Sequence, residues 1–316
     1  NQGKAGAGIN TTSAGTMPAT NPPYRGRFAP SPSGPLHLGS LITALGSYLD
    51  AKHNHGSWLV RIDDLDPPRE QAGAAHSILR SLESHGLHWD EEVTWQSRRS
   101  AAYEQALDLL ARHKNTFNCS CTRQQLSPAG ACQHSCKSRQ GDLVEPWAIR
   151  IARPPSSQVV FKDQLQGLQR EPIAADTDNY VVKRKDDLYA YQLAVVVDDA
   201  SASINRIVRG SDLIKTTARQ IYLQRALNVP TPAYCHLPVI TNNQGQKFSK
   251  RNHAPALIES EAAQNLRQAL AFLQQSTPPS ACSEPESILA FARQQWSLAS
   301  VPPVMAMAAT SITSPI

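Results

Sequence analysis

The residues from Arg27 to Ser40 read RFAPSPSGPLHLGS and place prolines, glycines and a histidine directly ahead of an apolar stretch. A helix start exposes unpaired N–H groups and carries partial positive charge, which suits a phosphate. Gly34 would let the backbone approach a ligand closely, and His37 would donate to a phosphate oxygen as negative charge develops there. The stretch predicts a phosphate-binding helix start. An ordinary capped helix after a proline-rich turn is the alternative.

A second motif, KFSKR, occupies residues 247–251 and follows a turn rich in Asn, Gln and Gly. In isolation it is typical of a solvated basic loop. However, the same chain also has the histidine-bearing helix start, and the two motifs would have complementary roles. Lys250 would reach the β- and γ-phosphates of ATP and stabilise the transition state of adenylyl transfer. The two motifs together predict a nucleotide site.

The cysteines form a third pattern. Four of the six lie within one short segment, in which CxC is followed by CxxxC: Cys119, Cys121, Cys132 and Cys136. A tight cluster indicates metal binding more than disulfides. Four thiolates leave no open coordination position, so we predict one structural zinc per chain. His134 is the spare ligand if Cys132 points away, and four unrelated buried thiols are the alternative. Cys235 and Cys282 stand alone and are predicted to be packing residues.

The elements that must position these motifs follow from hydrophobic periodicity and turn residues. Residues 1–23 are small, polar and aperiodic, which predicts a disordered tail. Strands are expected at 25–29, 58–62 and 236–240, strand-like patterning at 180–199, and helices at 36–52, 70–86, 99–113, 212–227 and within 254–300. The alternation of strand and helix is typical of a parallel nucleotide-binding sheet.

Composition and net charge limit the classes of protein and partner that fit this chain. The chain has 316 residues, 41% of them hydrophobic, and a formal net charge of +5. Mild basicity permits a nucleic-acid partner without requiring one. The chain has no apolar run long enough for a membrane span and no apolar signal core near its start, so we expect a cytoplasmic protein without a membrane partner.

Several segments resemble a known family. PSGPLHLGS resembles the HIGH signature of class I aminoacyl-tRNA synthetases, and KFSKR resembles their KMSKS loop. RFAPSPSG, WLVRIDDLDPPRE, YAYQLAVVVDD, IVRGSDLI and HLPVI are similar to the glutamyl branch of that class. The stretch after KFSKR is too short for the anticodon-binding region of a full glutamyl-tRNA synthetase. The chain therefore resembles the glutamyl-queuosine tRNA(Asp) synthetases, a truncated paralogous family, as do WQSRR, KFSKRNHAPAL and the CxC cluster.

The resemblance implies an α/β fold: a Rossmann-like class I catalytic domain with a zinc-bearing insertion, a small C-terminal helical region and no anticodon-binding domain. The implied divisions are a tail at 1–23, the first half of the catalytic domain at 24–115, the insertion at 116–179, the second half with the KFSKR loop at 180–251, and the helical region at 252–316.

The resemblance also implies an activity. Such an enzyme would activate L-glutamate with ATP and Mg²⁺ to glutamyl-adenylate without needing tRNA, then transfer glutamate to the queuosine base in the anticodon of tRNA(Asp). A monomer is expected. Two other readings stay open: a truncated glutamyl-tRNA synthetase that charges a 3′ end, and a catalytically decayed, zinc-bearing RNA-binding protein.

Site residues are carried over on the matching segments. The expected glutamate-binding residues are Arg27, Phe28, Ala29, Pro30, Ser31, Asp63, Tyr191 and Arg209. The expected ATP-binding residues are His37, Gly39, Lys247 and Lys250, of which His37 and Lys250 are also expected to be catalytic. Lys183, Arg184 and Lys185 would contact RNA phosphates or form a solvated loop.

Two departures from the family pattern concern single residues. RIDD stands where the family usually has RIED, so Asp63 would meet the substrate ammonium with a shorter side chain. The alternative for the acidic residues of this stretch is a solvated turn or salt bridges to Arg61 and Arg69. Cys132 stands where family members place a tyrosine, in a loop that is one residue shorter. Alone, Arg209 would more often be a surface ion-pair residue and Tyr191 an interior aromatic of a strand.

Overall fold

The computed structural model describes residues 22–128, 130–133, 136–152, 157–173, 179–242, 245–247 and 254–309. Most of the predicted N-terminal tail, His134 and Lys250 lie outside the described residues. The strands are β1 (Arg25–Phe28), β2 (Ser57–Ile62), β3 (Thr94–Trp95), β4 (Thr116–Cys119), β5 (Ala148–Ile151), β6 (Ser157–Asp163), β7 (Gly167–Ile173), β8 (Val181–Lys183), β9 (Arg206–Gly210), β10 (Ala233–Leu237), β11 (Val239–Thr241) and β12 (Ala306–Ala308). The helices are α1 (Leu38–His53), α2 (Ala74–Ser84), α3 (Ser100–Arg112), α4 (Tyr191–Ser201), α5 (Ile214–Ala226), α6 (Ala262–Phe272) and α7 (Pro285–Gln295).

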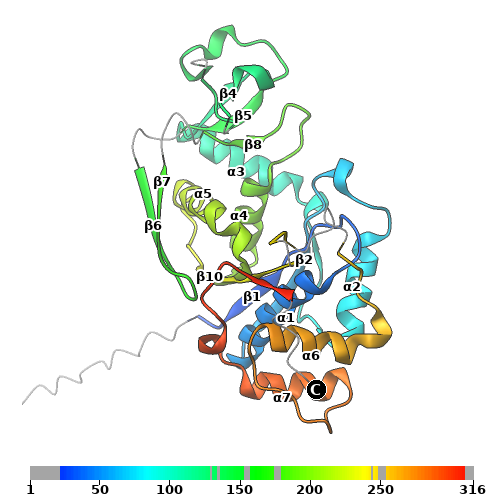
Figure 1. The fold of residues 1–316 in the computed structure, drawn as a ribbon. Coiled ribbons are helices and arrows are strands. Elements are labelled where there is room, and N and C mark those ends of the chain that lie inside the picture. Colours follow the sequence, from blue (N-terminus) through cyan, green and yellow to red (C-terminus); the bar gives the residue numbers. More distant parts are fainter. Residues whose placement is uncertain are drawn as a thin grey trace, which may run out of the picture.

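The central sheet is mainly parallel. β2 pairs with both β1 and β3, and β10 pairs with both β9 and β6, all in parallel, while β7 is antiparallel to β6. The two groups meet where the N–H of Asn205 donates to the carbonyl of Arg25 at 3.1 Å. Across the sheet the strands follow the order β3-β2-β1-β9-β10. Successive strands of the chain are added first on one side of β1 and later, from β9, on its other side, which is the doubly wound, Rossmann-like arrangement. Figure 1 shows the sheet of β4, β5 and β8, with Cys119 on β4, at the end of the molecule opposite α6 and α7.

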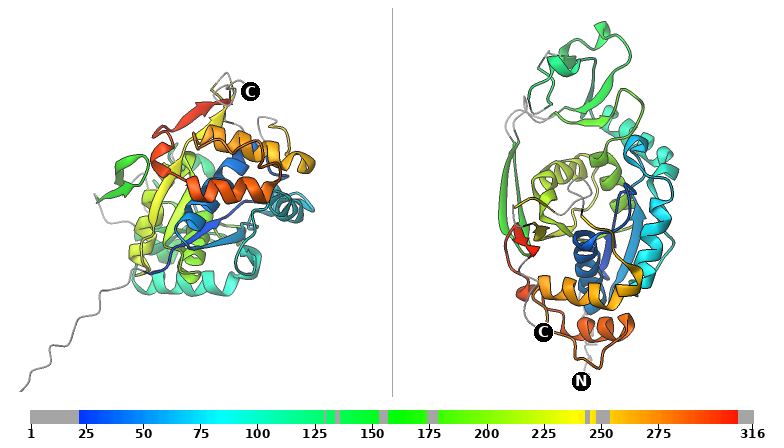
Figure 2. Two further views of the ribbon diagram at one scale, coloured as in Figure 1. Left: turned by 90° about the horizontal axis from the view of Figure 1, so that it is seen from below. Right: turned by 45° about the vertical axis from the view of Figure 1, so that its right-hand side comes forward.

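Helix α1 is the centre of the main core. Ten of its residues are buried, because apolar side chains surround it almost completely and both the sheet and the C-terminal helices cover it. Trp58 on β2 is fully buried, with its ring edge-on to Tyr48 at 5.3 Å and stacked on Phe28 at 6.4 Å. α6 and α7 cover the side of α1 that faces away from the sheet, as the two views of Figure 2 show. The packing fixes the N-terminus of α1 relative to the end of β1.

Two sequence-based predictions of elements were wrong in part. Residues 180–199 were expected to be strand-like, but only β8 is a strand and α4 begins at Tyr191. The run of β-branched valines suggested a strand, whereas α4 is buried on most sides, so its apolar residues follow one another without helical spacing. The strand expected at 236–240 is divided into β10 and β11 at Pro238, which has no N–H to continue the ladder.

Within the described part of the chain, no helix combines the length and the apolar character needed to cross a membrane.

Candidate active site

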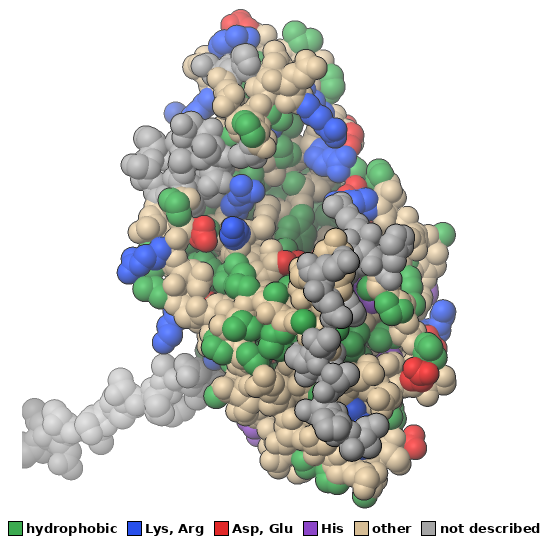
Figure 3. Space-filling view, in the orientation of Figure 1, with side chains coloured by type: hydrophobic (Ala, Val, Ile, Leu, Met, Phe, Trp, Pro, Cys, Tyr) green, Lys and Arg blue, Asp and Glu red, His purple; other side chains and the backbone are tan. Residues whose placement is uncertain are grey.

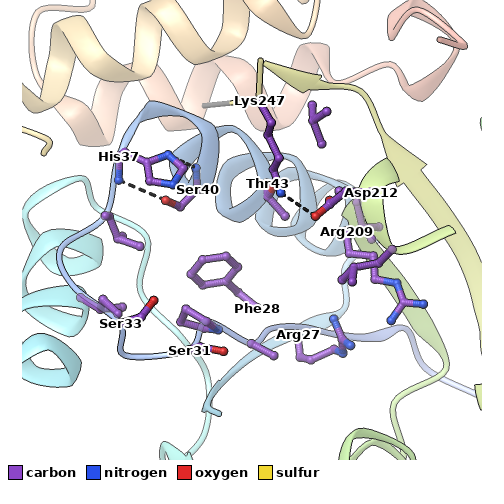
Figure 4. Close-up of a pocket in the computed structure, with 18 of the residues that line it drawn as sticks. Arg27, Phe28, Ser31, Ser33, His37, Ser40, Thr43, Arg209, Asp212 and Lys247 are labelled. Atoms are coloured by element: carbon purple, nitrogen blue, oxygen red, sulfur yellow. Dashed lines mark hydrogen bonds and ion pairs between the residues drawn. The ribbon is translucent and has the colours of Figure 1, made fainter. Parts of the chain in front are cut away.

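A cavity of about 610 Å³ opens at the carboxyl ends of β1 and β9, where the strand order reverses and ligands of doubly wound sheets bind. Its lining includes Arg27, Phe28, Ala29, Pro30, Ser31, Ser33, His37, Ser40, Thr43, Tyr191, Arg209, Asp212 and Lys247. In Figure 4, His37 and Ser40 lie on one side of the cavity and Arg27 and Arg209 on the other. Segments far apart in the sequence thus form a single site.

His37 is the N-cap of α1. Its Nδ1 accepts from the N–H of Ser40 at 3.3 Å, and Ser40 Oγ accepts from the N–H of His37 at 3.1 Å, so the two residues form a reciprocal capping box. An accepting Nδ1 leaves the imidazole proton on Nε2, which is then a donor. Helix capping and phosphate binding are therefore compatible roles for His37, because Nδ1 caps the helix and Nε2 would donate to a phosphate.

The first residue of the KFSKR motif lies at the cavity, and the segment on the other side of the motif reaches the start of α1. Lys247 lines the cavity and its Nζ lies 2.5 Å from Asp212 Oδ2. On the other side, the N–H of Leu257 donates to the carbonyl of Leu36 at 2.9 Å, and Ala256 forms a β-bridge with His37. The two motifs that the sequence singled out are thus anchored at one place. Lys250 itself lies outside the described residues.

Gly39 shapes the cavity without lining it. A Cβ there would lie 3.1 Å from two atoms of the His37 ring and 3.1 Å from Ile240 Cγ2. We expect Gly39→Ala to displace the imidazole and raise the KM for ATP by about three- to tenfold, with little change in Tm because alanine favours a helix by roughly 1 kcal/mol over glycine. Steady-state kinetics and thermal unfolding check this. An unchanged KM for ATP would show that the ring position is unimportant.

Two of the three arginines that line the cavity, Arg27 and Arg209, differ in how their charge is compensated. Arg27 donates to both oxygens of Asp199, from Nε at 3.0 Å and from Nη2 at 3.1 Å. Arg209 is only 3% exposed and forms no ion pair with any residue that the structure describes; its partners are His236 and Thr217, and its Nη1 has no hydrogen-bond acceptor. A buried charge with neutral partners is costly unless an anion binds beside it. Arg209 is therefore the stronger candidate for a substrate carboxylate.

Arg27 belongs to a buried ionic network beneath the cavity. Arg61 Nη1 donates to Asp199 Oδ1 at 2.6 Å, and Arg61 Nε donates to Asp63 Oδ1 at 2.6 Å. Burial acts to raise the pKa of Asp199, but the charges of Arg27 and Arg61 outweigh it and hold that pKa below its usual value. For Asp63, burial prevails over Arg61 and raises the pKa. The network fixes the ends of β1 and β2 against α4.

Removing one charge from this network should destabilise the protein strongly. We expect Asp199→Asn to lower the free energy of unfolding by about 3–5 kcal/mol, because it leaves two buried guanidinium groups short of a counter-charge. Glu91→Gln is the matched control: Glu91 pairs with Arg25 at 2.7 Å with a half-exposed side chain, and its loss should cost about 1 kcal/mol or less. Urea denaturation measures both, and equal losses would contradict the proposed importance of the network.

Asp63 and Tyr191 mark a second cavity beside the first. It measures about 630 Å³ and shares Ala29, Ser31, Arg69, Tyr191 and Leu213 with the first cavity. Asp63 lines the second cavity and not the first. Tyr191, at the start of α4, lies between the two and is 37% exposed. The structure thus places Asp63 beside the expected glutamate-binding residues, with its carboxylate already bound to Arg61.

The four clustered cysteines come together at β4 and the loops that follow it. Their sulfur atoms all lie within 4.8 Å of one another, and Cys121 Sγ is 3.6 Å from Cys132 Sγ and 3.5 Å from Cys136 Sγ. A tetrahedral zinc with bonds of about 2.3 Å needs sulfurs roughly 3.8 Å apart. Burial raises the pKa of the Cys119 and Cys121 thiols, so thiolates here need a cation beside them. Geometry and donor chemistry both fit zinc.

The basic residues at the end of β8 and directly after it, Lys183, Arg184 and Lys185, all have partners in the structure. Lys183 Nζ pairs with Glu104 at 2.9 Å, Arg184 Nη2 pairs with Asp186 at 2.6 Å, and Lys185 Nζ donates to the carbonyl of Ser120 at 2.7 Å. Ser120 lies between two of the clustered cysteines, so Lys185 holds the loop that bears them against the segment after β8. Contact of these residues with RNA stays a prediction.

Comparison with known proteins identifies the class to which this fold and site belong. The family described as tRNA synthetases class I (E and Q), catalytic domain, matches residues 24–274. A solved glutamate tRNA ligase from Elizabethkingia meningosepticum, in complex with its amino acid, superposes with a TM-score of 0.75 at 23% identity, covering 92% of this chain and 68% of that one. At that identity the match shows the fold, which is the catalytic fold of class I synthetases.

Curated relatives narrow the class further. The Glutamyl-Q tRNA(Asp) synthetase of Chromobacterium violaceum is 44% identical over 90% of this chain and 97% of its own. That of Serratia proteamaculans is 48% identical over 88% of this chain and 92% of its own. The chain belongs to the glutamyl-Q tRNA(Asp) synthetase family and is a synthetase-like ligase. This confirms the resemblance seen in the sequence.

Sequence reasoning missed the residues that hold the arginines. Asp199 ends the motif YAYQLAVVVDD, and His236 begins HLPVI, but neither was singled out. The sequence did contain a signal for both residues: each is an ionisable residue inside a strongly apolar stretch, where an unpaired charge is costly. Asp163 gave no comparable signal, because its segment reads as part of the insertion.

Proposed function

We propose that this protein activates L-glutamate with ATP, without tRNA, and transfers the glutamyl group to the queuosine base of tRNA(Asp). The names of its relatives support the amino acid and the acceptor. The observation that carries the amino-acid specificity is Arg209, a buried guanidinium in the cavity wall without an anionic partner among the described residues. The side-chain carboxylate of glutamate would supply the missing acceptor and counter-charge.

The first chemical step is adenylation. An oxygen of the glutamate α-carboxylate attacks the α-phosphorus of ATP, and the bond to pyrophosphate breaks. His37, through an Nε2–H donor, and the N-terminus of α1 would stabilise the negative charge that develops on the phosphates. Lys250 is proposed to act on the same phosphates. Mg²⁺, when bound with ATP, supplies further neutralisation of the phosphate charge.

In the second step, a hydroxyl of the cyclopentene ring of queuosine attacks the carbonyl carbon of the adenylate. The ester bond forms, AMP leaves, and the hydroxyl proton is released. The second cavity opens beside the first through Ala29, Ser31 and Tyr191, so an acceptor there would lie next to the adenylate. Lys and Arg side chains are spread over the upper part of the face shown in Figure 3, which suits an RNA partner.

The test separates the two steps. Glutamate-dependent exchange between ATP and pyrophosphate, measured without RNA, should occur with the protein alone. Labelled glutamate should then appear on tRNA(Asp) only when queuosine is present, and blocking the 3′ end should have no effect. Labelling that ignores queuosine would indicate a glutamyl-tRNA synthetase that charges the 3′ end. Absence of any exchange would overturn the proposal in favour of a non-catalytic RNA-binding protein.

A further inference from the structure

Arg209 is held from behind by a chain of buried polar groups. It lies on β9, directly opposite His236 on β10. Arg209 Nε donates to His236 Nε2 at 3.0 Å, and Arg209 Nη2 donates to Thr217 Oγ1 at 2.8 Å. The guanidinium also lies over the ring of Tyr234, with 5.3 Å between its carbon and the ring centroid. These contacts fix the plane of the guanidinium and leave Nη1 without a partner.

The contact with Arg209 determines the protonation state of His236. An arginine Nε can only donate, so His236 Nε2 must accept, and the imidazole is neutral with its proton on Nδ1. Nδ1 lies 2.6 Å from Asp163 Oδ2 and donates to it. Both side chains are completely buried, and burial lowers the pKa of His236, in agreement with a neutral ring.

Asp163 is oriented in turn by the backbone. Its Oδ1 accepts from the N–H groups of Leu165 at 3.0 Å, Gln166 at 2.8 Å and His236 at 3.2 Å. Burial acts to raise the pKa of Asp163, but the hydrogen bonds from His236 and the backbone prevail and lower it. With Oδ1 fully engaged by the backbone, Oδ2 is the oxygen that faces the histidine.

We propose that Asp163 and His236 are positioning residues that set the affinity for glutamate by holding Arg209 in place for the substrate carboxylate. The inference rests on the proposed function, in which Arg209 binds that carboxylate. Asp163 selects the Nδ1–H tautomer of His236, and that tautomer gives Arg209 Nε its acceptor. A buried carboxylate and imidazole stabilise a core less than apolar residues of the same size would, which fits a role in the site.

Asp163→Asn tests the tautomer. The three backbone N–H groups require an acceptor oxygen at the Oδ1 position, so the new amide nitrogen must face His236 and donate to its Nδ1. The histidine proton then moves to Nε2 and opposes the N–H of Arg209. We expect the KM for glutamate in ATP–pyrophosphate exchange to rise at least about tenfold, and the KM for ATP to stay within about twofold. If Asp163 had a purely structural role, the KM for glutamate and the KM for ATP would change to a similar extent, or neither would change.

His236 provides a second test if Asp163→Asn folds poorly. His236→Gln can offer an oxygen to Arg209 Nε, whereas His236→Leu cannot, so the glutamate KM should be closer to normal in the glutamine variant. His85→Gln is the matched control: His85 is equally buried and hydrogen-bonded at both ring nitrogens, but it lies at the end of α2, outside the residues that line the cavity. It should leave the glutamate KM unchanged.

The outcomes separate this inference from the proposed function. If Arg209→Gln raises the glutamate KM while Asp163→Asn and His236→Leu do not, the positioning role is wrong and the substrate role of Arg209 stands. If Arg209→Gln itself has no effect, the substrate role fails and the inference falls with it. Equal glutamate KM values for His236→Gln and His236→Leu would also overturn the inference.

Discussion

Arg209→Gln is expected to lower kcat/KM for glutamate in ATP–pyrophosphate exchange by about 10²- to 10³-fold, through a higher KM for glutamate. Truncating one partner of a buried, hydrogen-bonded charge pair typically costs about 2–5 kcal/mol. Glutamine has a similar shape but no charge, and it can offer a carboxylate only one amide donor group. Because Arg209 has no anionic partner among the residues described, its replacement breaks no ion pair in the free protein. The loss should therefore fall on substrate binding more than on folding.

Arg206→Gln is the control for this prediction. Arg206 lies on the same strand, but its guanidinium lies over the ring of Tyr24, 5.8 Å from the centroid, and it lines a different cavity. Its replacement should leave the kinetics of glutamate and ATP unchanged. Arg209→Lys should recover only part of the activity, because an ammonium keeps the charge but lacks the planar fork. An unchanged glutamate KM in Arg209→Gln would exclude Arg209 as the carboxylate-binding residue.

The sequence was most informative where chemistry and local structure agree. Prolines, Gly34 and His37 indicated a helix start, and that start is a capped helix whose N-terminus lies at the cavity. The cysteine spacing likewise indicated a metal site, because ligands close in sequence need little long-range folding to meet. In short motifs of this kind, the local backbone structure alone fixes how the residues lie relative to one another.

Residues that act through long-range pairing could not be predicted in the same way. Asp163 and His236 are 73 positions apart, and only the pairing of β6 with β10 brings them together. A sequence does not show that two strands will be neighbours when several other strands and helices lie between them along the chain, as β7, β8, α4, β9 and α5 do here. Likewise, YAYQLAVVVDD suggested a strand because a helix buried on most sides loses its amphipathic pattern. The site residues inferred from resemblance stay predictions until the variants are measured.

Cys121→Ser is expected to abolish zinc binding and unfold the segment that contains β4. A serine hydroxyl is a much poorer zinc ligand than a thiolate, and Cys121 Sγ lies near the tetrahedral spacing from two other sulfurs. Structural zinc contributes roughly 10–16 kcal/mol of apparent binding free energy in small metal-dependent units, far more than the small apolar cluster around Phe117 can replace. The purified variant should hold less than about a tenth of the zinc of the unaltered protein, by atomic absorption.

Hydrogen exchange and activity assays test the role of a metal at this cluster. Amide protection should fall in β4 and β5 and persist in α1 and β2, because the central core has its own apolar cluster. Cys282→Ser, a partly buried cysteine outside the cluster, should keep both zinc and protection. If the metal is structural and supports RNA contact, Cys121→Ser should retain glutamate-dependent exchange and lose transfer to tRNA. Loss of exchange together with zinc would instead mean that the cluster of Cys119, Cys121, Cys132 and Cys136 also supports the active site, through contacts such as that of Lys185 with Ser120.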